Sequence, residues 1–174
     1  MGPFGHCAVG LAAKPAAPKV PLAVLFLAAV FLDILAVAFA FAGIERVSAP
    51  LPWSHGLFMS MVWSGAAAVL IARIYRDYRA GLVAGLLVFS HWVLDWISHP
   101  IPFSSFSWRQ WRWDYGHPLP SDLPLLFGGS RTVGFGLYNS ISAVAATVLE
   151  LGMFAAGAVV CARWLARLRD RRMP

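Results

Sequence analysis

Two histidines and an aspartate recur at intervals of four residues in one apolar segment of the chain. They are His91, Asp95 and His99. Residues four apart lie on the same face of an α-helix. An imidazole and a carboxylate one turn apart can bind one metal ion, or two adjacent ions. The spacing therefore indicates a polar site on one face of a helix.

Ionisable residues also interrupt the other apolar segments. Asp33 lies in the first long segment, His55 opens the second, and Glu150 lies in the last. Burying an ionisable group inside a membrane span is costly, so each is a functional candidate. Ser54 is the expected N-cap of the helix that His55 opens.

The apolar segments themselves predict an all-α integral membrane bundle. Of the 174 residues, 59% are hydrophobic and 13% are charged, against about a quarter charged in soluble domains. About 20 apolar residues cross a bilayer. We expect one domain over residues 1–174, with the lipid bilayer as its partner. The four expected spans are residues 21–43, 55–72, 80–98 and 133–162.

Basic residues predict the orientation of this bundle. The net charge is +6, but Lys and Arg form no stripe that would bind nucleic acid. They gather at residues 14–19, 73–79 and 163–172. By the positive-inside rule, we expect a multi-pass protein of a bacterial-type inner membrane, with both termini cytoplasmic and loop 99–132 external. Tryptophans and arginines in that loop suit a headgroup belt or a lid over a substrate.

A short N-terminal helix brings one more histidine into consideration. We expect a helix over residues 3–14, which Pro15 and Pro18 separate from the first span. If it folds back as a re-entrant hairpin, His6 lies about 12 Å and Asp33 about 18 Å from the turn. A mismatch of depth remains, since Asp33 is farther than Asp95 from the external end of its span.

These residues together predict a metal site with two candidate catalytic groups. Histidine and carboxylate suit a divalent metal, above all zinc, with Mn or Fe as lesser options. Alternatively, each is a lone polar group that is hydrogen-bonded inside the bundle. Glu150 is a general base, a partner of His6, or a carboxyl that burial keeps protonated. The predicted ligands are His6, Asp33, His55, His91 and Asp95, and the candidate catalytic residues are Glu150 and His99.

The ordered motifs resemble the YdjM-like family of membrane-bound metal-dependent hydrolases, described as LexA-binding and inner-membrane-associated. Two departures are Trp53 and Gly56, where relatives read Tyr and Ser, and an insertion at about residues 100–121. The matching pieces are Gly5-His6, Asp33, Pro52-Trp53-Ser54-His55, Ser90-His91-Trp92-Val93-Leu94-Asp95, His99, Asp122-Leu123-Pro124-Leu125, Gly136-Leu137-Tyr138-Asn139-Ser140 and Glu150.

This resemblance implies a membrane-bound hydrolase. The order of the histidines and aspartates is also similar to that of zinc-dependent phospholipases C and nucleases, and it implies the same five ligands. We expect hydrolysis of a phosphoester or ester in a membrane-proximal, lipid-like substrate. The alternatives are a small transporter or ion-handling protein that uses the same groups, and a scaffold with a structural metal. The sequence leaves the oligomeric state open.

Overall fold

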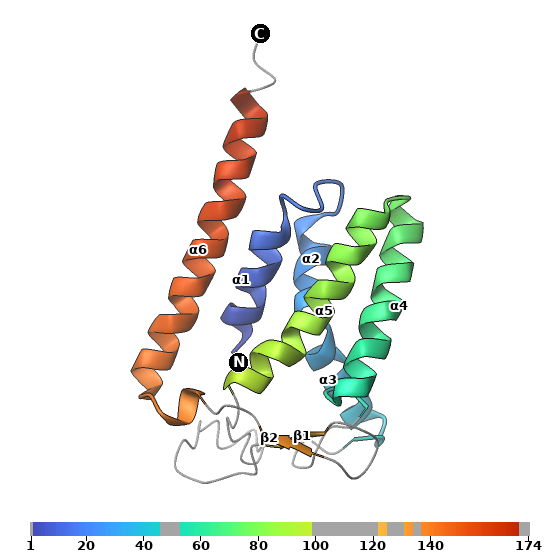
Figure 1. The fold of residues 1–174 in the computed structure, drawn as a ribbon, viewed down its shortest axis with the longest axis vertical. Coiled ribbons are helices and arrows are strands. Elements are labelled where there is room, and N and C mark those ends of the chain that lie inside the picture. The colour runs from blue at the N-terminus through green and yellow to red at the C-terminus, as the bar shows by residue number, and fades with distance from the viewer. Residues whose placement is uncertain (1, 46–52, 99–121, 125–130, 134–136, 171–174) are drawn as a thin grey trace.

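The computed structural model describes residues 2–45, 53–98, 122–124, 131–133 and 137–170. This part of the chain is helical apart from one hairpin of two three-residue strands (Figure 1). β1 pairs with β2 in antiparallel register, with Asp122 opposite Val133. The elements are α1 (Pro3–Ala13), α2 (Leu22–Ala29), α3 (Phe31–Phe41), α4 (Leu57–Tyr75), α5 (Tyr78–Ser98), β1 (Asp122–Pro124), β2 (Arg131–Val133), η1 (Leu137–Asn139) and α6 (Ala143–Asp170).

Three of these helices, α4, α5 and α6, are each long and apolar enough to cross a membrane. α2 and α3 pass the same test together, as a pair bent by 61°. Large apolar side chains such as Phe58, Leu70 and Val148 are exposed on the outside of the bundle, where lipid would cover them. The predicted all-α membrane bundle is confirmed, with three spans or four if the bent pair counts as one.

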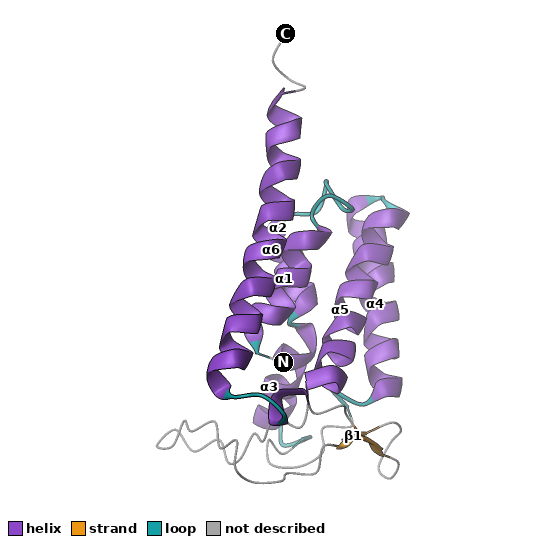
Figure 2. Ribbon diagram, turned by 60° about the vertical axis from the view of Figure 1, so that its left-hand side comes forward, coloured by secondary structure: helices purple, strands orange, loops and turns teal. Residues whose placement is uncertain are grey.

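The N-terminal helix folds back into this bundle, as the hairpin interpretation expects. α1 lies between α2 and α6 (Figures 1 and 2). The turn after it is tied by the Lys14 ammonium, which donates to the carbonyls of Val20 at 2.6 Å and Pro18 at 3.0 Å. With 11 residues, α1 is too short to cross a bilayer.

We predicted one straight span over residues 21–43, but the structure has two helices there, α2 and α3, with a bend between them. The break is at Val30, whose φ of −108° and ψ of 14° are not helical. The carbonyl of Ala29, just before the break, accepts a hydrogen bond from the His91 ring. Insertion of a side chain into the backbone ladder is a known cause of helix kinks. Beyond the bend, Asp33 and Asp95 both lie within 3.4 Å of His91 Nε2, so the expected mismatch between them is absent.

α5, which carries His91 and Asp95, packs closely against α4 through small residues. A Cβ added at Gly81 would lie 2.6 Å from the Cβ of Ala72, and one at Gly85 would lie 2.8 Å from the carbonyl of Ser64. Such distances are too short for real contacts, so only glycine permits this approach of the two backbones. The pair fixes α5 against the helix that follows His55.

Two other helices begin later than predicted. α4 begins at Leu57 after an N-cap at Gly56 that has no side-chain cap bond, so the prediction of Ser54 as the N-cap is wrong. α6 begins at Ala143 rather than at residue 133. The Ser142 hydroxyl caps it by accepting from the N–H of Ala145 at 3.2 Å. Most of the predicted external loop, residues 99–132, lies outside the described residues.

Candidate metal centre

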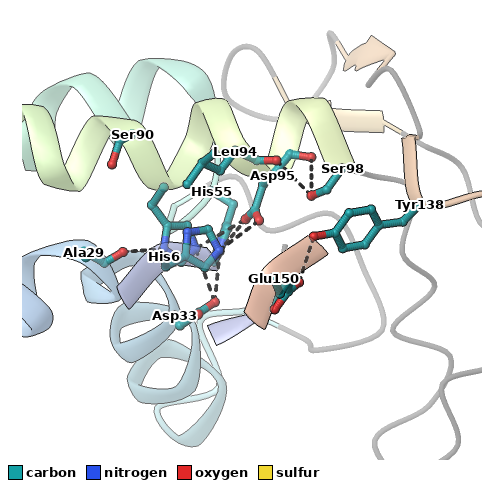
Figure 3. A network of polar contacts seen from close by, with 12 residues as sticks. His6, Ala29, Asp33, His55, Ser90, Leu94, Asp95, Ser98, Tyr138 and Glu150 are labelled. Atoms are coloured by element: carbon teal, nitrogen blue, oxygen red, sulfur yellow. Dashed lines mark hydrogen bonds and ion pairs between the residues drawn. The ribbon is translucent and has the colours of Figure 1, made fainter. Parts of the chain in front are cut away.

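The five predicted ligand residues lie close together, and Figure 3 labels four of them, His6, Asp33, His55 and Asp95. α5 supplies two of them because its one-turn spacing places both on the same face. The others come from α1, from α3 beyond the bend, and from the residues just before α4. They are His6, Asp33, His55, His91 and Asp95.

Two imidazole nitrogens each lie close to the same two carboxylate oxygens. The Nε2 atom of His91 lies 3.4 Å from Asp33 Oδ1 and 3.3 Å from Asp95 Oδ2. The Nε2 atom of His55 lies 3.5 Å and 3.7 Å from the same two oxygens. The ligand atoms of His55, His91 and Asp95 all lie within 4.8 Å of one another, and Asp33 lies within 3.5 Å of both imidazoles. This cluster could therefore hold a metal ion.

The His91 ring is oriented for ligation by its outer nitrogen. Its Nδ1 lies 2.8 Å from the carbonyl oxygen of Ala29. A carbonyl can only accept, so Nδ1 carries the proton and donates. In a neutral ring the Nε2 atom then has a free lone pair, which faces the two carboxylates. A backbone carbonyl that fixes the tautomer in this way is a common partner of metal-binding histidines.

The His55 ring is held in the same tautomer by Ser54 and Glu45. The sequence analysis did not identify Glu45 as part of the site. The Ser54 hydroxyl donates to Glu45 Oε2 at 2.7 Å, and it lies 2.9 Å from His55 Nδ1. The single hydroxyl proton is engaged by Glu45, so His55 Nδ1 must donate to Ser54. The sequence motifs do not include Glu45, which lies eight residues before the Trp53-Ser54-His55 segment that it contacts.

His6 lies beside this arrangement rather than within it. Its ring stacks on that of His91, with centroids 3.7 Å apart and planes 6° apart. An imidazole ligates in its own plane, so an ion in the plane of His91 lies well out of the plane of His6. Nε2 of His6 lies 3.3 Å from Asp95 Oδ1, the oxygen that is not shared with His55 and His91. His6, Asp33 and His91 form a second possible group, but ring geometry favours the set around His55.

Buried atoms without partners support the presence of a cation here. Among the described residues, Nε2 of His91 and both ring nitrogens of His6 are buried without a hydrogen-bond partner. Such atoms are costly to bury, and a metal ion would satisfy at least the lone pair of His91. It would also balance the charge of two carboxylates in an apolar bundle. The residues present therefore fit a divalent metal.

Asp33 marks the open side of the cluster. Its side chain is 52% exposed, whereas the side chains of His55, His91 and Asp95 are 9%, 0% and 5% exposed. The three buried residues shield their side of the cluster from solvent. Solvent or another molecule can approach on the side of Asp33.

Glu150 makes its hydrogen bonds outside the cluster. Its Oε1 atom accepts from the backbone N–H of Gly2 at 2.5 Å and from the Tyr138 hydroxyl at 2.9 Å. Neither group of possible metal ligands includes it, and Figure 3 shows it paired with Tyr138. It anchors the start of α1, four residues before His6. This geometry favours a role in positioning α1.

The other candidate catalytic residue, His99, lies outside the described residues, as does the loop rich in tryptophan and arginine. Comparison of the chain with protein-family models, curated proteins and solved structures finds no match in any of the three. The resemblance to the YdjM-like family stays a prediction from motifs. Function must therefore be argued from the site itself.

Proposed function

We propose that this protein is a metal-dependent hydrolase embedded in a membrane, with a zinc ion held by His55, His91 and Asp95 and with Asp33 beside both imidazoles. The observation that carries the proposal is the inward orientation of both imidazoles. Each donates its Nδ1 proton outward, to Ala29 or to Ser54, and directs Nε2 toward the same two carboxylates.

Zinc is the metal that these ligands suit best. Imidazole nitrogens and carboxylate oxygens are among its preferred donors. Magnesium and calcium favour oxygen ligands in larger number. Manganese and iron share the donor types, but they commonly take more ligands than four.

Each residue of the site would have a separate role in hydrolysis. Zinc, when bound, supplies a Lewis acid and lowers the pKa of a coordinated water. His55, His91 and Asp95 form the buried side that holds the ion. Asp33 lies on the exposed side, where substrate can approach, and Nε2 of His6 lies 3.3 Å from the second oxygen of Asp95. Glu150 keeps α1, and with it His6, in place.

The surroundings of Asp33 favour a lipid-like substrate. Ile34 and Val37, on the same helix, are exposed by 42% and 56%. A molecule that reaches Asp33 along α3 passes an apolar surface, which suits an amphiphile with a phosphoester or ester group. We therefore propose a membrane-proximal substrate of that class.

The proposed location is a bacterial-type inner membrane, with the site toward the external side. The turn after α1, the turn between α4 and α5, and the end of α6 lie at the end of the bundle away from the site (Figure 1). These segments carry Lys14, Arg76 and Arg167, so the positive-inside rule places that end in the cytoplasm. α1 begins near the site end (Figure 1), so this orientation puts the end of α6 in the cytoplasm but not the start of α1, in contrast to the expectation that both termini are cytoplasmic.

Metal analysis of the purified protein tests this proposal. We expect about one zinc ion per chain at neutral pH, and a loss of most of it in each of His91→Ala, Asp95→Asn and His55→Ala. His117→Ala is the matched control, because His117 belongs to no predicted ligand set. If the wild type binds no zinc, or if all three variants keep it, the proposal fails.

Hydrolysis is tested separately with a fluorescent glycerophospholipid in vesicles. We expect cleavage that a chelator abolishes, that added zinc restores, and that Asp95→Asn lacks. No cleavage by zinc-loaded protein would contradict the hydrolase proposal.

One observation favours ion handling as a second candidate. The break between α2 and α3 places a backbone carbonyl beside the cluster, and broken helices are common at the ion sites of transporters. Cation uptake into liposomes that depends on an ion gradient, without cleavage of lipid, would favour this candidate.

A further inference from the structure

Glu45 reaches the site because of a specific turn at the end of α3. Gly43 has a φ of +70°. The N–H of Ile44 donates to the carbonyl of Phe39 at 2.8 Å, and that of Gly43 donates to Ala40 at 3.1 Å. This is a Schellman motif, which reverses the chain at a helix end. It places the next residue, Glu45, against the segment before α4.

The Glu45 carboxylate has two separable sets of contacts. Its Oε1 atom accepts from the backbone N–H groups of Trp53 at 2.6 Å and Ser54 at 3.0 Å. Its Oε2 atom accepts from the Ser54 hydroxyl. Glu45 is 5% exposed and Ser54 is fully buried. The first set fixes the backbone next to His55. The second set fixes the direction in which the Ser54 hydroxyl donates its hydrogen bond.

We propose that Glu45 is a positioning residue that acts through the Ser54 hydroxyl to hold His55 with its proton on Nδ1 and its Nε2 directed at the metal. This inference rests on the proposed function. The carboxylate accepts the hydrogen bond that the hydroxyl donates. The hydroxyl oxygen therefore accepts from Nδ1, and the lone pair of a neutral His55 stays on Nε2. Partners of this kind change metal affinity by about 10–100-fold when removed.

A matched pair of serines tests the hydroxyl. Ser54 and Ser90 each precede a proposed histidine ligand. The Ser90 hydroxyl donates to the carbonyl of Leu87 in its own helix at 2.7 Å. We expect Ser54→Ala to weaken zinc binding by about 10–100-fold and Ser90→Ala to leave it unchanged. Ser54→Thr keeps a hydroxyl and should restore most of the affinity. Competition with a chelator of known affinity gives these values.

Glu45→Gln tests the direction of the hydrogen bonds. The glutamine carbonyl can still accept from both backbone N–H groups, but its amide would donate to Ser54 rather than accept. The hydroxyl proton then turns toward His55 Nδ1, and the ring proton moves to Nε2. We expect zinc affinity to fall at least as far as in Ser54→Ala. Nitrogen-15 NMR of labelled histidine in the zinc-free protein should show the change of tautomer at His55.

The outcomes separate this inference from the function on which it rests. A wild type without zinc overturns both. If the wild type binds zinc and Ser54→Ala behaves like Ser90→Ala, only the role of Glu45 and Ser54 is overturned. Equal losses in Ser54→Ala and Ser54→Thr also overturn it, because loop geometry rather than the hydroxyl would then be responsible.

Discussion

The two ends of the helical bundle are held together by different kinds of contact. Away from the site, α1, α2, α4 and α5 share a core of buried apolar side chains. At the site end, many polar side chains are buried beside a smaller apolar cluster of Leu32, Val88 and Trp92. The larger apolar cluster contains Ala17, Val20, Leu25, Ala29, Ile71, Ala80, Ala84 and Leu87, whereas the buried polar residues are His6, Glu45, Ser54, His55, Ser60, His91, Asp95, Ser98 and Glu150.

This difference separates what folds the protein from what it can bind. The apolar end needs no ligand, because close packing between small side chains and glycines completes its contacts. The site end keeps buried imidazole nitrogens without hydrogen-bond partners, at a cost of about 1–3 kcal/mol for each such group. A bound cation should therefore stabilise one end of the bundle far more than the other.

Metal removal should give the largest effect. We expect a chelator to reduce hydrogen-exchange protection around residues 31–41, 53–60 and 88–98, and to leave the apolar end nearly unchanged. Zinc at about 1,000 times its Kd stabilises the protein by about 4 kcal/mol, and removal reverses this gain. Asp95→Asn is the control, since it should not respond to zinc. Equal loss of protection at both ends would contradict the division between them.

A substitution at the apolar end should have the next largest effect. Gly81→Ala places a Cβ against Ala72 and the carbonyl of Ala68, which should lower the free energy of unfolding by about 1–3 kcal/mol. Gly65→Ala on α4 meets nothing within 4 Å and should raise it by about 0.5–1 kcal/mol. Denaturant unfolding in detergent measures both values. Zinc content per folded chain should not change, and similar stability of the two variants would argue against close packing.

Sequence patterns predicted the helices well because their signals are local. Runs of apolar residues located α4, α5 and the short helix α1 to within a few residues. The spacing of His91 and Asp95 placed both on one face of α5, since only helix geometry is needed for that inference. The convergence of the five ligand residues followed from a plausible fold-back of α1, which the structure also has.

The missed features all depend on contacts between distant residues. The bend at Val30 has no proline or glycine to announce it, and His91 contacts the carbonyl at that point from another helix. Glu45 belongs to the site only because Gly43 turns the chain toward Ser54. Ser54 looked like a helix cap because its residue type fits one. In the structure its hydroxyl is instead hydrogen-bonded to Glu45 and His55.

Glu150→Gln should have a smaller effect, because it keeps an oxygen that can accept from Gly2 and Tyr138. We expect the free energy of unfolding to fall by about 1 kcal/mol or less, with zinc content and vesicle hydrolysis close to wild type. Thermal unfolding and metal analysis provide the comparison. A fall in hydrolysis of about 100-fold or more at full zinc content would instead indicate that Glu150 is a general base.

The smallest effect should come from Asp77, at the end of the bundle away from the site. Asp77 Oδ1 accepts from the N–H of Ala80 at 3.2 Å, and Oδ2 lies 3.2 Å from the Lys19 ammonium. The hydrogen bond from Ala80, and then Lys19, lower the pKa of this carboxyl below its ordinary value. The carboxylate therefore stabilises the fold fully above about pH 4, and this contribution is lost as pH falls through the lowered pKa.

Asp77→Asn, which can keep the bond to Ala80, should lower the thermal midpoint by about 1–2 °C at neutral pH. The difference from wild type should shrink on acidification. Both proteins should be measured with chelator present, so that protonation of the histidine ligands does not contribute. Lys19→Gln should give a similar loss, and the double variant should add little to it. A difference that grows as the pH falls would show that the Asp77 carboxylate does not stabilise this end of the bundle.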